Sequence, residues 1–149
     1  MVSVESELAA LRAREEIAGV MQRYARGVDA RDAESLRTCF TDDATADYVG
    51  IQECDSPEHI VSWVVGAVSR YDSTHHLNGP PDVVLDGDSA SSVMYLQAAH
   101  MRPAERGGGI LFLGGIYRDE LRRTESGWRI ARRVFETTWR QQTSEGSAV

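Results

Sequence analysis

The chain is 149 residues long, with 42 % hydrophobic and 26 % charged residues, a composition typical of one globular domain rather than of a disordered segment. Its net charge of −7 disfavours sequence-independent binding to nucleic acid or to an anionic membrane. All 16 cationic side chains are arginine, which excludes a lysine Schiff base and the lysine of a P-loop.

The two cysteines, Cys39 and Cys54, stand apart in the sequence and form no CxxC pair, so neither a disulfide framework nor a zinc site is expected. No apolar run approaches the roughly 20 residues that span a bilayer, and the amino terminus is acidic and amphipathic, unlike a signal peptide. We therefore expect a cytoplasmic protein with no nucleic-acid or membrane partner.

The first predicted element is a long helix that begins at a serine cap, Ser3 or Ser6, and runs to about Val28. Its apolar side chains recur largely at three- and four-residue spacing, at Leu8, Leu11, Ile17, Val20, Met21, Tyr24 and Val28. Asp29 lies on one shoulder of this stripe. It either begins the polar turn 29–32 or, as a costly carboxylate at the edge of the core, pairs with one of the later histidines.

A short helix is expected next, over residues 33–40, and then a strand over residues 44–49 that carries Tyr48. Ser56-Pro57-Glu58 predicts the start of a third helix, because serine caps the exposed amides and proline suits the first helical position. The apolar face of this helix comprises Ile60, Trp63, Val64, Ala67 and Val68.

After Tyr71 the apolar period changes from 3.6 to 2 and indicates strands. The expected strands are 75–85, interrupted at 78–81 by two prolines, then 90–101, 110–123 and 128–139. Helices followed by an antiparallel run of strands predict an α+β cone, in which a curved mixed or antiparallel sheet wraps around the N-terminal helices and leaves an internal pocket. We expect one domain over residues 1–140 and a flexible tail over 141–149.

Five pieces of the sequence follow one another in a distinctive order and spacing. They are Gly27-Val-Asp29-Ala-Arg-Asp-Ala-Glu-Ser-Leu36-Arg-Thr-Cys-Phe40, Ala46-Asp-Tyr48, Ser73-Thr-His75-His-Leu-Asn-Gly79, Ala98-Ala-His100-Met-Arg and Gly127-Trp128-Arg-Ile. In this order, over roughly residues 10–140, the chain resembles the SnoaL-like branch of the nuclear-transport-factor-2-like superfamily. The pattern is most similar to that of scytalone dehydratase-type proteins.

The resemblance implies a catalytic dyad of Asp29 and His75. Adjacent side chains of a strand point to opposite faces, so His75 and His76 cannot both face the cone, and the resemblance favours His75. In such a dyad the carboxylate fixes the tautomer of the imidazole and supports its protonated form, which makes the other ring nitrogen a usable base.

Three further catalytic residues are implied by the resemblance: His100 as a second histidine, Tyr48 as a pocket tyrosine and Tyr24 as a tyrosine on the first helix. His100 also shares the strand face of Met94, Leu96 and Ala98, although a solvated position at the strand end is equally compatible with the sequence. The residues expected to contact the substrate are Val28, Trp63, Leu96 and Tyr117.

Departures from the scytalone dehydratase pattern at Val28, Gly115 and Tyr117 argue against scytalone as the substrate. The resemblance thus implies a cofactor-independent lyase or isomerase that acts on a small hydrophobic, oxygenated cyclic molecule such as a polyketide or steroid. A cyclase, a hydrolase, or a non-catalytic ligand-binding or assembly domain are the alternatives. The superfamily also implies a homo-oligomer, either a dimer or a trimer.

Two other interpretations of charged residues are weaker. Two histidines and one carboxylate can form a metal site, but compact ligand spacing is lacking, so we expect no metal. Arg122, Arg123, Arg132 and Arg133 are expected to be mostly solvated charges on the sheet, although one inward arginine would suit an anionic or oxygenated ligand.

Overall fold

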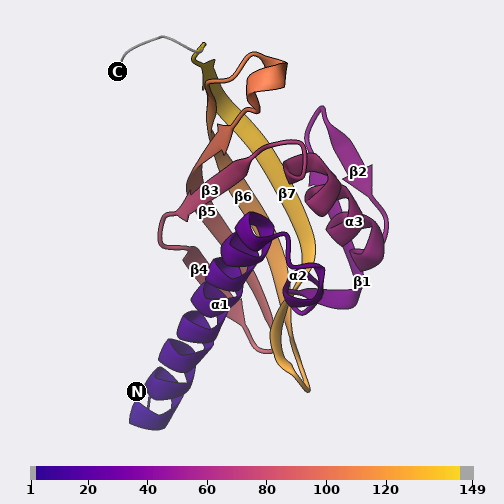
Figure 1. The fold of residues 1–149 in the computed structure, drawn as a ribbon. Helices are drawn as coiled ribbons and strands as arrows, with labels where there is room; N and C mark the ends of the chain where they lie inside the picture. Colours follow the sequence, from indigo (N-terminus) through magenta and orange to yellow (C-terminus); the bar gives the residue numbers. More distant parts are fainter. Residues whose placement is uncertain (1–2, 145–149) are drawn as a thin grey trace.

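The computed structural model describes residues 3–144 and consists of three helices, one short 3-10 turn and a curved, open sheet (Figure 1). The helices are α1 (Val4–Ala30), α2 (Ala33–Arg37) and α3 (Pro57–Val68), and η1 (Ala104–Arg106) is the 3-10 turn. The strands are β1 (Phe40–Tyr48), β2 (Gln52–Cys54), β3 (Ser73–Asn78), β4 (Asp82–Asp86), β5 (Ser89–Met101), β6 (Ile110–Thr124) and β7 (Gly127–Gln142).

The sheet has seven strands in the order β2-β1-β7-β6-β5-β3, with β4 also paired to β5. Neighbouring strands are antiparallel except β1 and β7, which run parallel. The helices cover one face of this sheet, with α1 against β3 and β7 and α3 against β1 (Figure 1). The predicted α+β cone with a curved mixed sheet is therefore confirmed.

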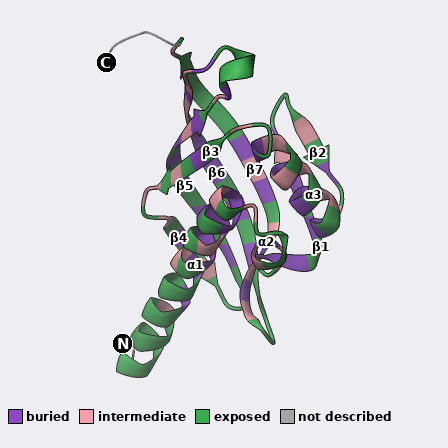
Figure 2. Cartoon of the chain, viewed as in Figure 1, coloured by how far each residue is buried: buried purple, intermediate pink, exposed green. Residues whose placement is uncertain are grey.

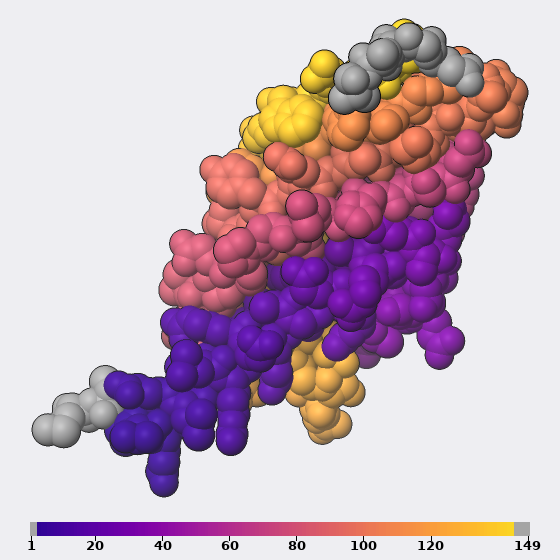
Figure 3. Space-filling view, turned by 60° about the vertical axis from the view of Figure 1, so that its left-hand side comes forward, coloured from indigo at the N-terminus to yellow at the C-terminus, as the bar shows by residue number. Residues whose placement is uncertain are grey.

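Helix α1 begins at Ser3, whose side chain accepts a hydrogen bond from the amide of Ser6, as the serine cap predicts. Its C-terminal half supplies the buried stripe, whereas its first turns are exposed and project beyond the body of the protein (Figures 2 and 3). At Gly27 a Cβ would lie 3.0 Å from the Leu36 side chain, so glycine allows α2 to pack closely on α1. The chain turns at the end of α1, where Arg31 adopts a left-handed backbone conformation with φ 55°.

One helix boundary and one strand differ from the sequence prediction, and the predicted interruption at 78–81 is present. Helix α2 ends at Arg37 rather than residue 40, because Phe40 already pairs with Ile130 of β7. Strand β2 was not predicted; it is short and pairs only with the end of β1. The interruption at 78–81 separates β3 from β4, both of which pair with β5.

The C-terminal strand is longer than predicted. Strand β7 continues to Gln142, so the expected tail begins inside this strand, and residues 145–149 of it lie outside the described residues. Within residues 3–144, no helix combines the length and apolar character needed to cross a membrane.

Candidate active site

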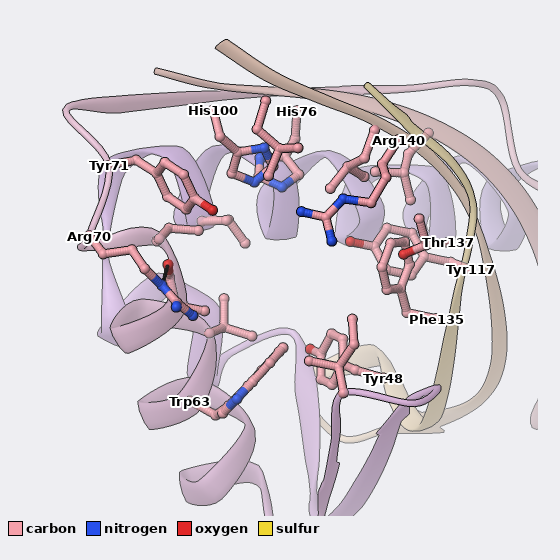
Figure 4. A pocket seen from close by; sticks show the side chains of 18 of the residues that line it. Tyr48, Trp63, Arg70, Tyr71, His76, His100, Tyr117, Phe135, Thr137 and Arg140 are labelled. Atoms are coloured by element: carbon pink, nitrogen blue, oxygen red, sulfur yellow. Dashed lines mark hydrogen bonds between the residues drawn. The ribbon is translucent and has the colours of Figure 1, made fainter. Parts of the chain in front are cut away.

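A pocket of about 350 Å³ opens between the helices and the concave face of the sheet (Figure 4). Side chains from α1, β1, α3 and from the strands β3, β5, β6 and β7 line it. Most of the lining is aliphatic or aromatic, and all four residues expected to contact the substrate belong to it, namely Val28, Trp63, Leu96 and Tyr117. Such a cavity suits a small, largely apolar ligand.

Asp29 lies at the end of α1 and forms three hydrogen bonds with β3. Its Oδ1 is 2.7 Å from Nδ1 of His76 and accepts a bond of 2.9 Å from the Thr74 hydroxyl, while its Oδ2 accepts the His76 amide at 2.9 Å. Burial pushes the pKa of Asp29 upward, but the bonds from the His76 side chain and backbone outweigh it, and the pKa is lowered overall. The carboxylate is thus ionised and held in one orientation.

The expected partner, His75, was the wrong choice of the two adjacent histidines. His75 is exposed and faces away from Asp29, whereas the His76 side chain is only 10 % exposed and lines the pocket. Thr74 and His76 share the strand face that α1 covers, and strand alternation turns His75 to the other side. The alternation of side chains along the strand correctly predicted that only one of the two histidines can face the cone. The family resemblance pointed to the residue just before the one that does.

His100 lies beside His76 on the neighbouring strand. It pairs in register with Thr74, is buried, and lines the pocket, with its ring centre 5.5 Å from that of His76 and 4.8 Å from that of Tyr71. Burial lowers the pKa of His100 to about 4, and the charge of His76 adds to this effect. His100 is therefore neutral at pH 7 and does not repel a protonated His76.

The buried, neutral His100 should make the protein less stable in mild acid. In the unfolded chain this imidazole takes up a proton near pH 6.5, but in the folded protein only near pH 4, so the unfolded state binds more protons in between. We expect a loss of about 1–2 kcal/mol in unfolding free energy between pH 7 and pH 4.5, allowing for partial solvation. Urea unfolding at both pH values should show this loss reduced in His100→Leu; equal losses in the two proteins would contradict it.

Three tyrosines meet at the inner end of the pocket. The hydroxyls of Tyr24 and Tyr48 are 3.0 Å apart, and the ring of Tyr117 packs edge to face against Tyr24 at 5.9 Å. Burial raises the pKa of all three phenols, most strongly those of Tyr48 and Tyr117. They are therefore neutral donors, and because the contacts of Tyr24 with Tyr48 and Tyr117 use at most two of the three hydroxyl hydrogens, the group retains a hydrogen for a ligand.

A fully buried ion pair lies behind these tyrosines. The Arg133 guanidinium donates two bonds of 2.8 Å to Asp119, and both side chains are 0 % exposed. The same guanidinium lies 4.2 Å from the ring centre of Tyr24 and 3.9 Å from that of Tyr117. Arg133 thus fixes the two tyrosines from behind the pocket.

Several lining residues were not predicted from the sequence. Trp63 and Tyr48, both expected in the pocket, pack with their ring centres 4.2 Å apart. The lining residues that the sequence did not predict include Arg70, Tyr71, Thr137 and Arg140. Thr137 and Arg140 come from the far end of β7; Thr137 lies in the strand predicted over 128–139, and Arg140 lies between that strand and the expected tail. Among residues 3–144, no three histidine, cysteine or carboxylate side chains gather as a metal site would require.

Most of the chain matches a known protein family. The sequence model of the SnoaL-like domain family matches residues 9–134. The chain belongs to the SnoaL-like family. The family predicted from the five sequence pieces is thereby confirmed, and the open cone with N-terminal helices is the nuclear-transport-factor-2-like fold.

This SnoaL-like protein has similar proteins of known sequence and known structure. It is 33 % identical over 122 residues to the uncharacterized protein Rv2910c of Mycobacterium tuberculosis, covering 81 % of this chain and 82 % of that one. The crystal structure of Kfla4162 from Kribbella flavida superposes with a TM-score of 0.83 at 25 % identity, covering 89 % and 95 % of the two chains. Hexachlorocyclohexane dehydrochlorinase LinA-type3 from Novosphingobium barchaimii shares the fold, with a TM-score of 0.80 at 18 % identity over 99 % of each chain.

Proposed function

We propose that this SnoaL-like protein is a cofactor-independent lyase that eliminates water from a small hydrophobic, oxygenated cyclic substrate. The observation that carries the proposal is the contact of 2.7 Å between Asp29 and Nδ1 of His76, at the wall of an otherwise largely apolar pocket. A carboxylate and histidine held in this way form a general base. The likeness in fold to a dehydrochlorinase, which by its name removes hydrogen chloride, also supports an elimination.

The proposed reaction uses His76 twice. The Asp29 carboxylate accepts a hydrogen bond from Nδ1, so the proton resides there and Nε2 offers its lone pair to the pocket. Nε2 removes a proton from the carbon next to a carbonyl, and the electron pair of that C–H bond enters the enolate. As the C=C bond forms, the β C–O bond breaks, and the departing hydroxide takes the proton back from Nε2 and leaves as water.

The developing negative charge on the carbonyl oxygen requires hydrogen-bond donors. Tyr48 and Tyr117 line the pocket as neutral phenols, and Tyr24 joins them through its bond to Tyr48. Fixed donors directed at a developing oxyanion stabilise the transition state without reorganising. We assign the role of oxyanion donor to the tyrosine group, and the role of base to His76.

The proposal is tested with a panel of cyclic β-hydroxy ketones and polyketide-like phenols, with product identified by mass spectrometry. We expect loss of water catalysed by the wild type and strongly reduced in Asp29→Asn and His76→Ala. Cyclised or hydrolysed products would instead assign the same pocket to a cyclase or a hydrolase. Loss of water that persists in both variants would refute the dyad.

A further inference from the structure

The charges in the pocket are all of one sign, although the whole chain carries a net charge of −7. Within the described part of the chain, the lining includes the guanidinium groups of Arg70 and Arg140 but no aspartate or glutamate side chain. Asp29 does not line the cavity, and its ionised carboxylate is engaged by three hydrogen bonds from β3. The cavity therefore favours a ligand with a negative charge.

Arg140 is the better placed of the two arginines. It projects from β7 into the cavity, with its guanidinium between His76 and Thr137 (Figure 4). Its charge also acts on His100, because it contributes to the lowered pKa of that imidazole. An anion bound by Arg140 would thus lie next to the proposed base.

Arg140 also has no carboxylate partner in residues 3–144, unlike four other arginines. Arg37, Arg122, Arg123 and Arg133 each form an ion pair with an aspartate or glutamate. Arg70 donates its Nε proton to the backbone oxygen of Ala67 in α3, so part of the Arg70 guanidinium is already hydrogen-bonded. The unpartnered Arg140 guanidinium presents two parallel N–H groups, which match the two oxygens of a carboxylate.

We propose that the substrate of this pocket carries a carboxylate, which Arg140 binds at the pocket wall beside His76 while the hydrophobic ring system fills the aromatic interior. Thr137, adjacent to Arg140 in the cavity, offers a hydroxyl as a further donor (Figure 4). The identification of the ligand as a substrate rests on the proposed lyase function, whereas the preference for the anion rests on Arg140 alone. Arg140 is exposed, so with a neutral polyketide or steroid in the pocket its guanidinium would be hydrogen-bonded by solvent rather than by the ligand.

The test compares two probes of nearly equal shape, 2-naphthoate and 2-naphthamide, by isothermal titration calorimetry at pH 7. We expect the wild type to bind the carboxylate roughly tenfold more tightly than the amide, since charge-assisted hydrogen bonds are about twice as strong as neutral ones. In Arg140→Gln the preference should fall to within about twofold. Arg140→Lys, which keeps the charge but not the fork, should retain part of it.

Two matched variants separate a local contact from net charge. Arg118→Gln removes an exposed arginine from β6 outside the pocket lining and should keep the full preference, and Arg70→Gln should keep most of it. A preference that survives Arg140→Gln, or that Arg70→Gln or Arg118→Gln abolishes, would overturn the proposal. Failure of the wild type to bind naphthoate, or to prefer it, would do the same.

The naphthoate titration measures binding and the mass-spectrometric assay measures turnover, so the anion site and the lyase function are tested separately. A protein that eliminates water from none of the candidate substrates, yet prefers naphthoate through Arg140, would refute the lyase function and uphold the anion site. Elimination from neutral ketones without any preference for naphthoate would uphold the lyase function and refute the anion site.

Discussion

Replacing His76 by alanine is expected to lower kcat/KM for the elimination by about 10² to 10⁴, the usual contribution of general acid–base catalysis. Replacing the adjacent His75 should leave kcat/KM within about twofold, because His75 is exposed and faces away from Asp29. The two variants remove the same functional group one residue apart on the same strand. Steady-state kinetics on the substrate found in the panel measures both effects.

Circular dichroism and thermal unfolding of both histidine variants control for loss of fold. Asp29→Asn provides an independent check, since an amide at this position can no longer act as the anionic partner of Nδ1 of His76. The loss of activity in Asp29→Asn should appear mainly as a lower kcat, while the Kd for a bound product changes little. Equal losses of kcat/KM in His75→Ala and His76→Ala would show that the orientation of the two histidines on β3 does not decide which one acts as the base.

Replacing Arg133 by methionine is expected to reduce the free energy of unfolding by about 3–5 kcal/mol, the largest change in stability that we predict. The substitution leaves Asp119 as an unpaired charge in a site where both side chains are 0 % exposed. It also removes the cation that packs between Tyr24 and Tyr117. Denaturant unfolding at pH 7 gives the value directly.

The double variant Asp119→Leu with Arg133→Met provides the decisive comparison. Removing both charges together leaves no buried ion without a partner, so the double change should cost much less than the sum of the two single changes. An additive result would mean that Asp119 and Arg133 contribute independently. A single Arg133→Met variant as stable as the wild type would show that the pair is dispensable.

Much of the fold follows from local patterns in the sequence. The apolar spacing of α1, the serine caps at Ser3 and Ser56 and the alternation along β5 all predicted elements that the structure contains. The strand β2 and the early start of β1 were not predictable in this way. Both depend on pairing with distant segments, such as Phe40 with Ile130, which no local propensity encodes.

The site was predicted less completely, and each error has a structural cause. Period 2 separates His75 from His76 but does not say which face α1 covers, and a displacement of one residue inverts the answer. Arg133 was one of four arginines expected to be mostly solvated, and the sequence did not show which of them faces inward. Strict alternation from Trp128 and Ile130 would point residue 133 outward. The pairing of β6 with β7 shifts between Glu120 and Leu121, and this irregularity turns Arg133 and Phe135 inward.

Arg140 could not have been assigned to the pocket from the sequence. It follows several exposed residues of β7, in a segment that borders a polar tail. Only the length and curvature of β7 bring it over the cavity that α1 and α3 close (Figures 1 and 4). Composition did exclude a lysine in this role, so arginine is the only permanently cationic side chain available to the site.

Proton removal by His76 is the central claim, and deuterium exchange tests it without requiring a leaving group. Cyclic ketones that lack a β-hydroxyl are incubated with the protein in deuterium oxide, and label at the carbon next to the carbonyl is followed by NMR. We predict incorporation well above the buffer rate with the wild type and with His75→Ala, and incorporation at the buffer rate with His76→Ala. Incorporation by His76→Ala at the wild-type rate would contradict the account.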